Sequence, residues 1–326
     1  INNMRVLFIG GTGLISSACS RLAIEKGIDL YHFNRGKSHR HIDGVKTIIG
    51  NIRNINESKN ELKDYSFDVV VDWICFNIEH AKNSYYLFKN KTNQFIFISS
   101  ASIYQKPIPT LPITEETPIK NPFWQYSRDK IACEKFFQEM YKENQFPITI
   151  IRPSHTYDKT SIPLSWGYTA IDRMKERKKI IIHGDGTSIW VMTHHQDFAK
   201  GFLGILGNKK SIGERFHITS DELLTWNKIY QTFADELGVP LTAVHVTSEK
   251  IAKIDSKVGA SLLGDKSYSV IFDNSKIKKF VPEFECTESF QNGVKGIIDF
   301  YRNNPSWQIV DESNNMIIEE IIKKYS

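Results

Sequence analysis

The chain has 326 residues, of which 40% are hydrophobic and 24% charged, and its formal net charge is +5. This composition excludes a disordered or collagen-like chain, and the length corresponds to about two domains. No run of residues reaches the roughly 18 apolar residues of a membrane span. The first residues lead into a predicted strand without a secretory signal, and the four cysteines form no Cys-x-x-Cys pair. We therefore expect a cytoplasmic protein without a structural metal.

Short apolar runs alternate with amphipathic stretches in the first half of the chain. Residues 5–9 form a near-continuous apolar run, which predicts a strand, and residues 13–27 place Leu14, Ala18 and Leu22 on one stripe of a helix. Alternating strands and helices predict parallel βαβ units with helices on both faces of a sheet. The predicted fold is therefore α/β, a Rossmann-type doubly wound parallel sheet. Further strands are predicted at residues 29–34, 45–49, 67–71, 94–98 and 148–151.

The pattern loosens after Pro153, where short helices and two isolated strands, at residues 179–183 and 243–246, are predicted. We expect residues 1–157 to form the Rossmann domain. Residues 158–326 should form mainly a smaller α/β substrate domain, with residues 193–219 returning to the first domain. Ligands of open α/β sheets bind at the carboxyl ends of the strands, so a site is expected where the two domains meet.

A glycine-rich loop, Gly-Gly-Thr-Gly-Leu-Ile-Ser at residues 10–16, joins the first predicted strand to the first predicted helix. Glycines here allow a tight turn and the close approach of a pyrophosphate, and the helix amides point at the anion. The position of the usual third glycine holds Ser16, which is still small enough for close packing. The loop therefore predicts a dinucleotide site made by Gly10, Gly11, Thr12, Gly13, Leu14 and Ile15.

The end of the second predicted strand bears on the choice of cofactor. A carboxylate about 20 residues after the glycine loop binds the ribose hydroxyls of NAD, but here Asn34 is followed by Arg35, with Lys37 close by. A guanidinium group pairs well with phosphate. The pattern favours NADP over NAD, and the alternative of an Arg35 that simply points to solvent stays open.

Tyr126 and Lys130 lie four residues apart in a helix that is predicted to run to about residue 141, so they share a helix face. A free tyrosine titrates near 10. A cation about 4 Å away supplies about 4 kcal/mol at an effective dielectric near 20, which corresponds to a pKa near 7. Lys130 is therefore an adequate partner for a catalytic Tyr126.

Five motifs occur together in this chain: residues 10–16, Ser99 to Tyr104, Tyr126-x-x-x-Lys130, Arg152-Pro153, and Gly184-Asp-Gly186 followed by His194 and Asp197. Together they resemble the extended short-chain dehydrogenase/reductase superfamily, of the NAD-dependent epimerase/dehydratase type. The resemblance implies hydride transfer between a nicotinamide and a substrate. It makes Tyr126 the general acid/base, Ser100 the donor to the reacting oxygen, and Lys130 the residue that holds the cofactor ribose. Further cofactor contacts are implied at Asn51, Ile52, Trp73, Ile74, Pro153, Ser154 and His155.

The chain departs from this family pattern at two places. The 4,6-dehydratases of the family carry Thr-Asp-Glu where this chain has Ser100-Ala-Ser102, so we expect no dehydration. The arginine that grips the diphosphate in sugar-nucleotide enzymes falls on Trp190, which cannot neutralise a pyrophosphate. Trp190 either stacks on a substrate or packs in the core. The residues expected at the substrate are Ser102, His155 and Trp190.

Two functions of different classes stay open. The first is an NAD(P)-dependent oxidoreductase or epimerase that acts on a hydroxyl or keto group of a sugar-like or small polar substrate. The second is a non-catalytic protein that binds RNA or senses nicotinamide, because residues 33–37 and the layout of the second half also resemble the chloroplast stem-loop RNA-binding branch. The family resemblance further implies a homodimer through the Tyr126 helix. Substrate specificity is expected in residues 157–166 and 252–267.

Overall fold

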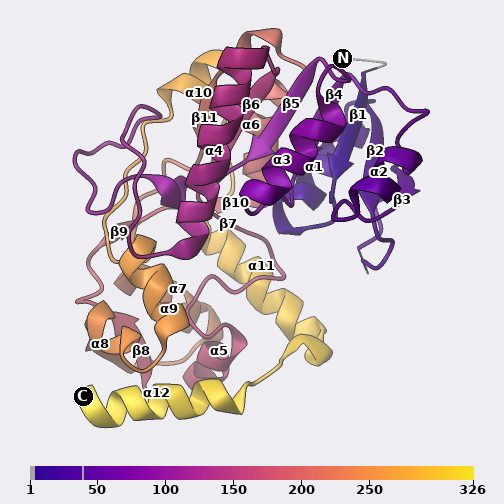
Figure 1. Cartoon of the computed structure of the whole chain (residues 1–326). Coiled ribbons are helices and arrows are strands. Elements are labelled where there is room, and N and C mark those ends of the chain that lie inside the picture. The colour runs from indigo at the N-terminus through magenta and orange to yellow at the C-terminus, as the bar shows by residue number, and fades with distance from the viewer. Residues whose placement is uncertain (1–3, 39) are drawn as a thin grey trace.

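The structure is a computed structural model that describes residues 4–38 and 40–326, so residues 1–3 and His39 of the predicted first domain lie outside the described residues. Its largest sheet has seven strands in the order β11-β6-β5-β4-β1-β2-β3, all parallel (Figure 1). The order from β3 to β6 is that of the Rossmann fold, which confirms the predicted fold class. The strands are β1 (Arg5–Ile9), β2 (Asp29–Asn34), β3 (Lys46–Ile49), β4 (Val69–Asp72), β5 (Gln94–Ile98), β6 (Ile148–Pro153) and β11 (Arg215–Ile218).

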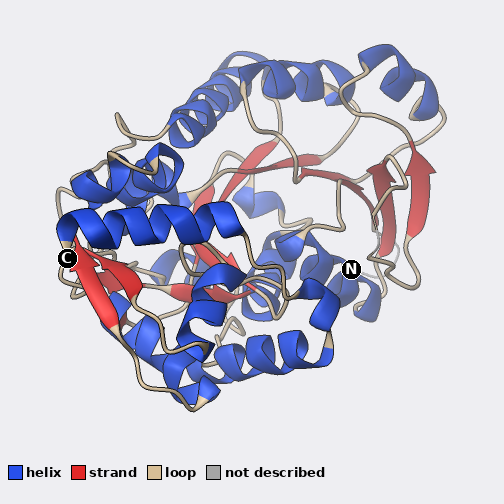
Figure 2. Cartoon of the chain, turned by 90° about the horizontal axis from the view of Figure 1, so that it is seen from below, coloured by secondary structure: helices blue, strands red, loops and turns tan. Residues whose placement is uncertain are grey.

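Helices cover both faces of this sheet (Figure 2). Along β1, Val6 and Phe8 pack into one core cluster with α1 (Leu14–Glu25) and α6 (His195–Ile205). Leu7 and Ile9 pack into a second cluster, with α3 (Ile78–Phe88) and α4 (Gln125–Asn144). Successive side chains of a strand point to opposite faces, so a strand buried on both sides must be apolar at nearly every position. This is why residues 6–9 form a continuous apolar run after the exposed Arg5.

The second half of the chain forms a separate group of helices and short strands, in the lower part of Figure 1. Here β8 (Ile180–His183) and β13 (Ala243–Val246) pair with each other in parallel. Both strands were predicted at these places. Their pairing was not predicted, and it supplies the hydrogen-bond partners that their backbone groups need. Two smaller pairs are β7 (His155–Tyr157) with β10 (Met192–His194), and β9 (Ile189–Trp190) with β12 (Leu224–Thr225).

The remaining elements lie mostly in this second group or connect it to the sheet. The helices are α2 (Ile55–Glu61), α5 (Tyr168–Lys175), α7 (Trp226–Leu237), α8 (Ser248–Ala252), α9 (Ser256–Ser261), α10 (Ser275–Phe280), α11 (Phe290–Asn303) and α12 (Glu312–Tyr325). Short helical turns are η1 (Ala101–Ile103), η2 (Lys209–Ser211) and η4 (Pro305–Trp307), and η3 (Leu262–Lys266) is a single π-helical turn.

The chain comes back to the large sheet twice. Residues of α6 pack against α1, and β11 extends the sheet beside β6. Ile277, Val281 and Phe284 join the same core cluster, a second return that the predicted domain boundaries did not include. The Rossmann part of the molecule is therefore assembled from three separate stretches of sequence.

Local side chains set several helix starts. Asn54 accepts a hydrogen bond from the backbone of Glu57 at the start of α2, and Asn77 accepts one from His80 at α3, the usual device for satisfying free N–H groups. The α4 helix has no side-chain cap. Instead Asn121, four residues before it, accepts hydrogen bonds from the two backbone N–H groups that precede the helix.

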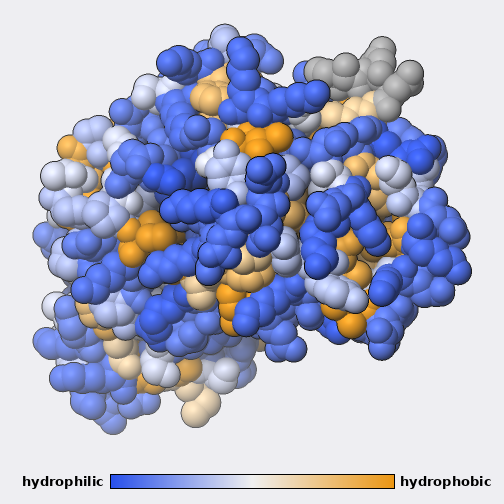
Figure 3. Space-filling view, turned by 45° about the horizontal axis from the view of Figure 1, so that its top comes forward, coloured by the Kyte–Doolittle hydropathy of each residue, from blue (hydrophilic) through white to orange (hydrophobic). Residues whose placement is uncertain are grey.

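The surface is mostly polar where it can be seen. In Figure 3, hydrophilic residues cover most of the visible face and apolar residues lie in small patches between them. Within the described part of the chain, no helix is both long and apolar enough to cross a membrane.

Candidate active site

The glycine loop after β1 has a backbone that only glycine adopts easily. Gly10 and Gly11 both have φ of +97°, and a Cβ on Gly11 would overlap the ring of His32. His32 Nε2 lies 2.8 Å from Ser20 Oγ, which donates to the Gly11 carbonyl at 3.0 Å. Burial lowers the pKa of His32 to about 4, so a neutral ring packs against the loop from the sheet side and holds it in place.

A cavity of about 500 Å³ opens at this loop. Two of its hydroxyls, on Ser99 and Ser154, are buried and have no hydrogen-bond partner in the described structure. Unpaired buried donors beside the start of a helix are what a polar, anionic ligand would satisfy. The lining includes most of the residues predicted for the reactive end of the cofactor: Gly10 to Ile15, Trp73, Ile74, Ser100, Tyr126, Lys130, Pro153 and Ser154.

A neighbouring cavity of about 460 Å³ brings together the residues predicted for the adenosine end, namely Thr12, Asn34, Arg35, Lys37, Asn51 and Ile52. Arg35 and Lys37 are exposed, and Asn34 Oδ1 accepts a hydrogen bond from the Gly36 backbone at 2.8 Å. Arg53 also lines this cavity and donates to the Ile74 carbonyl. Arg53 was not predicted as a site residue, although it directly follows the predicted cofactor residues Asn51 and Ile52. Among the described residues of this lining, three are cationic and none is acidic.

Ser100 and Tyr126 lie side by side where β5 ends and α4 begins. Ser100 Oγ is close enough to the Tyr126 hydroxyl to lower its pKa. It lies 2.9 Å from Ser102 Oγ, which in turn lies 2.7 Å from Ser127 Oγ. Ser102 and Ser127 are buried, so this chain of hydroxyls fixes the orientation of Ser100. Ser127 is a residue that the sequence analysis did not single out.

Lys130 lies one helical turn after Tyr126, and its side chain is buried. Its Nζ donates to the carbonyls of Cys75 at 2.6 Å and Ile98 at 2.8 Å. An ammonium group has three protons to donate, so one remains. Because Lys130 also lines the 500 Å³ cavity, that proton is available to a ligand there.

In the structure without a cofactor, the charge of Lys130 does not offset the effect of burial on the pKa of Tyr126. Burial raises the pKa of Tyr126, the hydrogen bond from Ser100 opposes this rise, and the charge of Asp265 adds to it. Lys130 Nζ lies 5.8 Å from the centre of the Tyr126 ring and hydrogen-bonds two carbonyls instead of the hydroxyl. Its charge is therefore largely satisfied by the backbone.

A third cavity, of about 290 Å³, lies on the other side of Tyr126. It shares Ser100, Tyr126 and Ser154 with the 500 Å³ cavity, and the 37% of Tyr126 that is exposed lines both. The rest of its lining is Ala101, Ser102, Trp124, His155, Trp190, Val191, Asp265, Lys266, Val270 and Phe272. Trp124, Asp265 and Lys266 were not predicted individually. Asp265 and Lys266 do lie within the predicted specificity segment, residues 252–267.

His155 and Trp190 form one unit in this cavity. Trp190 Nε1 donates to His155 Nδ1 at 3.0 Å, which leaves the His155 proton on Nε2. Burial, with a smaller contribution from the Lys266 charge, lowers the pKa of His155 to about 3, so the ring is neutral. Trp190 is buried in the core beside Trp226, as one of the two alternatives predicted. It also lines the cavity, and its stacking on a substrate stays a prediction. His155 does not line the 500 Å³ cavity.

A buried ion pair holds α4 against the sheet. Arg152 of β6 donates to the Glu134 carboxylate at 2.9 and 2.6 Å, and its third nitrogen donates to the Tyr104 hydroxyl and the Glu115 carbonyl. Removing one partner of such a pair is strongly destabilising. The pair lies one turn beyond Lys130 and so fixes the helix that carries Tyr126 and Lys130.

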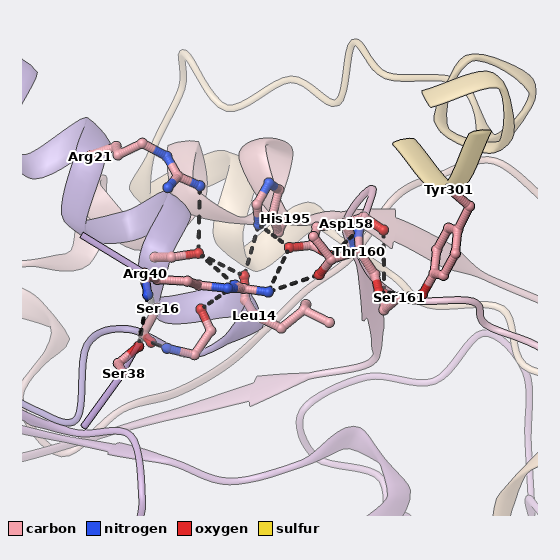
Figure 4. Close-up of polar contacts among 12 residues, drawn as sticks. Leu14, Ser16, Arg21, Ser38, Arg40, Asp158, Thr160, Ser161, His195 and Tyr301 are labelled. Carbon is pink, nitrogen blue, oxygen red and sulfur yellow. Dashed lines mark hydrogen bonds and ion pairs between the residues drawn. The ribbon is translucent and has the colours of Figure 1, made fainter. Parts of the chain in front are cut away.

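A second polar cluster joins the start of α1 to the second half of the chain (Figure 4). Arg40 donates to the Gly13 carbonyl at 3.1 Å and to Thr160 Oγ1 at 2.8 Å, and lies 3.4 Å from Asp158. His195 Nδ1 donates to the Leu14 carbonyl at 2.8 Å. Among residues 4–38 and 40–326, no group of three or more His, Cys, Asp or Glu side chains could hold a metal ion.

The comparisons with known proteins agree with this arrangement. The chloroplast stem-loop binding protein of 41 kDa b from Arabidopsis thaliana is 24% identical and covers 97% of this chain and 84% of that protein. The UDP-glucuronic acid 4-epimerase of Bacillus cereus, solved with UDP-glucuronic acid and NAD, has a TM-score of 0.74 at 20% identity over 92% of this chain and 99% of that one. The dTDP-glucose 4,6-dehydratase of Bacillus anthracis, solved with NAD, has a TM-score of 0.75 at 20% identity over 93% and 98%. These two likenesses show the fold. The model of the NAD-dependent epimerase/dehydratase family matches residues 6–219, and this chain therefore belongs to that family.

Proposed function

We propose that this chain is an NAD(P)-dependent oxidoreductase or epimerase that transfers a hydride to or from a hydroxyl or keto carbon of a sugar-like or small polar substrate. The observation that carries the proposal is the shared wall of Ser100, Tyr126 and Ser154 between the 500 Å³ and 290 Å³ cavities. A cofactor in the first and a substrate in the second would meet at the Tyr126 hydroxyl. Membership of the NAD-dependent epimerase/dehydratase family supports the same assignment.

The residues of the first cavity suit a nicotinamide dinucleotide. When bound, that cofactor supplies the group that accepts or donates a hydride. The glycine loop and the first amides of α1 would hold its pyrophosphate, and the free proton of Lys130 would bind a ribose hydroxyl. Ser99 and Ser154, whose hydroxyls have no partner in the described structure, would hydrogen-bond the nicotinamide end.

The chain's own chemistry is proton transfer at one oxygen. In the oxidative direction Tyr126 Oη takes the proton of the substrate hydroxyl, and in the reductive direction it returns that proton. Ser100 would donate a hydrogen bond to the reacting oxygen of the substrate. Ser102 and Ser127 hold the Ser100 hydroxyl in its orientation. The tyrosinate form would be favoured by the positive nicotinamide ring of the oxidised cofactor together with the Lys130 charge. We expect no loss of water, because the end of β5 offers the hydroxyls of Ser100 and Ser102 where dehydration needs an acid and a base.

The cofactor we propose is NADP. The solved relatives described above contain NAD, but the lining of the 460 Å³ cavity offers Arg35, Lys37 and Arg53 and no acidic residue. A cluster of cations suits a ribose 2′-phosphate. The carboxylate that would favour NAD is replaced by Asn34.

Thermal unfolding with NADP, with NAD and with neither tests the proposal. A ligand at 100 times its Kd stabilises the folded chain by about 2.7 kcal/mol, which raises the Tm by about 2 °C or more for a chain of this size. We expect a larger shift with NADP than with NAD. If neither cofactor shifts the Tm, the proposal fails, and binding of a stem-loop RNA becomes the function to test.

A further inference from the structure

The 290 Å³ cavity contains a cation that makes no direct ion pair. Lys266 lines it, and within the described residues no carboxylate forms an ion pair with its Nζ, which lies over the Trp124 ring at 5.4 Å. The neighbouring acid, Asp265, is paired instead with the buried Lys106 at 3.5 Å. Asp265 therefore makes no direct ion pair with Lys266, although its negative charge acts on Lys266 from the same lining.

The backbone around Lys266 is held firmly. Asn121 Nδ2 donates to the Gly264 carbonyl at 2.6 Å and to the Ser102 carbonyl at 2.9 Å, so the π-helical turn η3 is tied to the end of β5. The Lys266 carbonyl accepts a hydrogen bond from His183 Nε2 at 3.0 Å. A Cβ on Gly264 would overlap Trp124, so η3 packs directly against the start of the catalytic helix. Single π-helical turns are often found at functional sites.

The surroundings make an anion favourable at this position. Burial lowers the pKa of Lys266, and the charge of Asp265 opposes this shift; the net direction is that of an ammonium group that has lost water without a hydrogen-bonded carboxylate. A partly buried charge without an ion pair is unfavourable, and a ligand that neutralises it recovers part of that free energy. The neutral His155 of the same cavity keeps a proton on Nε2, since its Nδ1 accepts from Trp190, and so provides a second donor.

We propose that the 290 Å³ cavity binds an anionic sugar-like substrate and that Lys266 pairs with its carboxylate or phosphate group. This rests on the proposed function of that cavity. The position where sugar-nucleotide enzymes carry a phosphate-binding arginine is here Trp190, which is buried and bonded to His155, so the cation sits on a different element. The volume is at the lower end for ligand cavities, which suits one sugar ring with a charged substituent. Trp124, Trp190 and Phe272 offer apolar faces to the ring.

The test is a set of binding titrations on the full chain saturated with its cofactor. The probes are D-glucuronate, D-glucose 6-phosphate and neutral D-glucose, each titrated by calorimetry at pH 7. A hydrogen-bonded charge pair predicts that at least one anionic sugar binds roughly tenfold tighter than glucose, or more. Tighter binding of glucuronate alone would identify the anionic group of the substrate as a carboxylate. Tighter binding of glucose 6-phosphate alone would identify it as a phosphate.

Three variants distinguish a direct contact with Lys266 from a general effect of positive charge on the protein. Lys266→Met should reduce the affinity of the anionic sugar to that of glucose, and Lys266→Arg should keep most of the preference. Lys257→Met, an exposed lysine of the adjacent helix α9, removes the same charge outside the cavity and should change nothing.

The proposal is overturned if glucose binds as tightly as both anions, if none of the three sugars binds, or if Lys266→Met keeps the preference. A chain whose Tm neither NAD nor NADP shifts would instead contradict the proposed function itself, so the two failures are distinguishable.

Discussion

The 500 Å³ cofactor cavity and the 290 Å³ substrate cavity meet at Tyr126 but are assembled in different ways. The first draws its lining from the glycine loop and from the ends of neighbouring strands of one sheet. The second combines the end of β5 and the start of α4 with Trp190 and with η3, which follows more than a hundred residues later. The motifs of the cofactor cavity are therefore local in sequence. The contacts of the substrate cavity depend on how two distant parts of the chain pack together.

Changing Tyr126 affects the point where both cavities meet and should give the largest effect. Tyr126→Phe removes the proton acceptor and should reduce turnover roughly 10²- to 10⁴-fold, while the Tm shift with NADP stays unchanged. Turnover is measured as the change in nicotinamide absorbance with the first substrate found. Tyr141→Phe, on the exposed face of the same helix, is the matched control. Normal turnover of Tyr126→Phe would remove Tyr126 from the mechanism.

Gly11→Ala should damage the cofactor cavity alone. An alanine at φ of +97° is strained, and its Cβ would overlap His32, so we expect a loss of more than about 2 kcal/mol in unfolding free energy and no Tm shift with either cofactor. Gly238→Ala has a positive φ of +68° but meets nothing within 4 Å. This control should lose about 1 kcal/mol of unfolding free energy and keep the rise in Tm that the cofactor causes. Equal cofactor shifts in both variants would contradict the role of the loop.

Acidification should lower the unfolding free energy of the chain, because a buried neutral histidine lies at each of the two cavities. Burial lowers the pKa of His32 to about 4 and that of His155 to about 3, both below the ordinary 6.5. The unfolded chain then binds more protons as the pH falls, so this stability is complete above about pH 6.5 and is lost toward pH 4. For His32 the loss at pH 5 is about 2 kcal/mol.

Urea unfolding at pH 7.5 and pH 5 measures this loss. His32→Gln should reduce the difference between the two pH values, and the exposed His41→Gln should not. A difference that His32→Gln leaves unchanged would show that His32 already binds a proton in the folded chain.

Arg35→Ala should give the smallest effect and separate the two cofactors. Loss of one phosphate contact at an exposed position should weaken NADP binding about tenfold and leave NAD binding unchanged. The Kd of each cofactor is measured by tryptophan fluorescence titration. Equal weakening of NAD would refute a contact between Arg35 and the 2′-phosphate.

The sequence by itself determined the sheet and the residues that follow its strands. Residues 6–9 are apolar throughout because both faces of β1 are covered there, and glycines at 10 and 11 are required where φ is positive and the side chains of the sheet lie close. Such signals are local, since strand period, helix face and turn geometry depend on a few neighbouring residues. The same locality made Ser100, Tyr126 and Lys130 identifiable as a group.

Tertiary structure alone decided which distant residues share the substrate cavity. Lys266 reads as one lysine among many in the sequence, and only the docking of η3 through Asn121 brings it beside the Tyr126 helix. The same holds for the return of Ile277 to the Rossmann core and for Arg40, which joins Gly13 to Thr160. Packing between segments far apart in sequence leaves no periodic signal in either segment, because each contact depends on the position of the other.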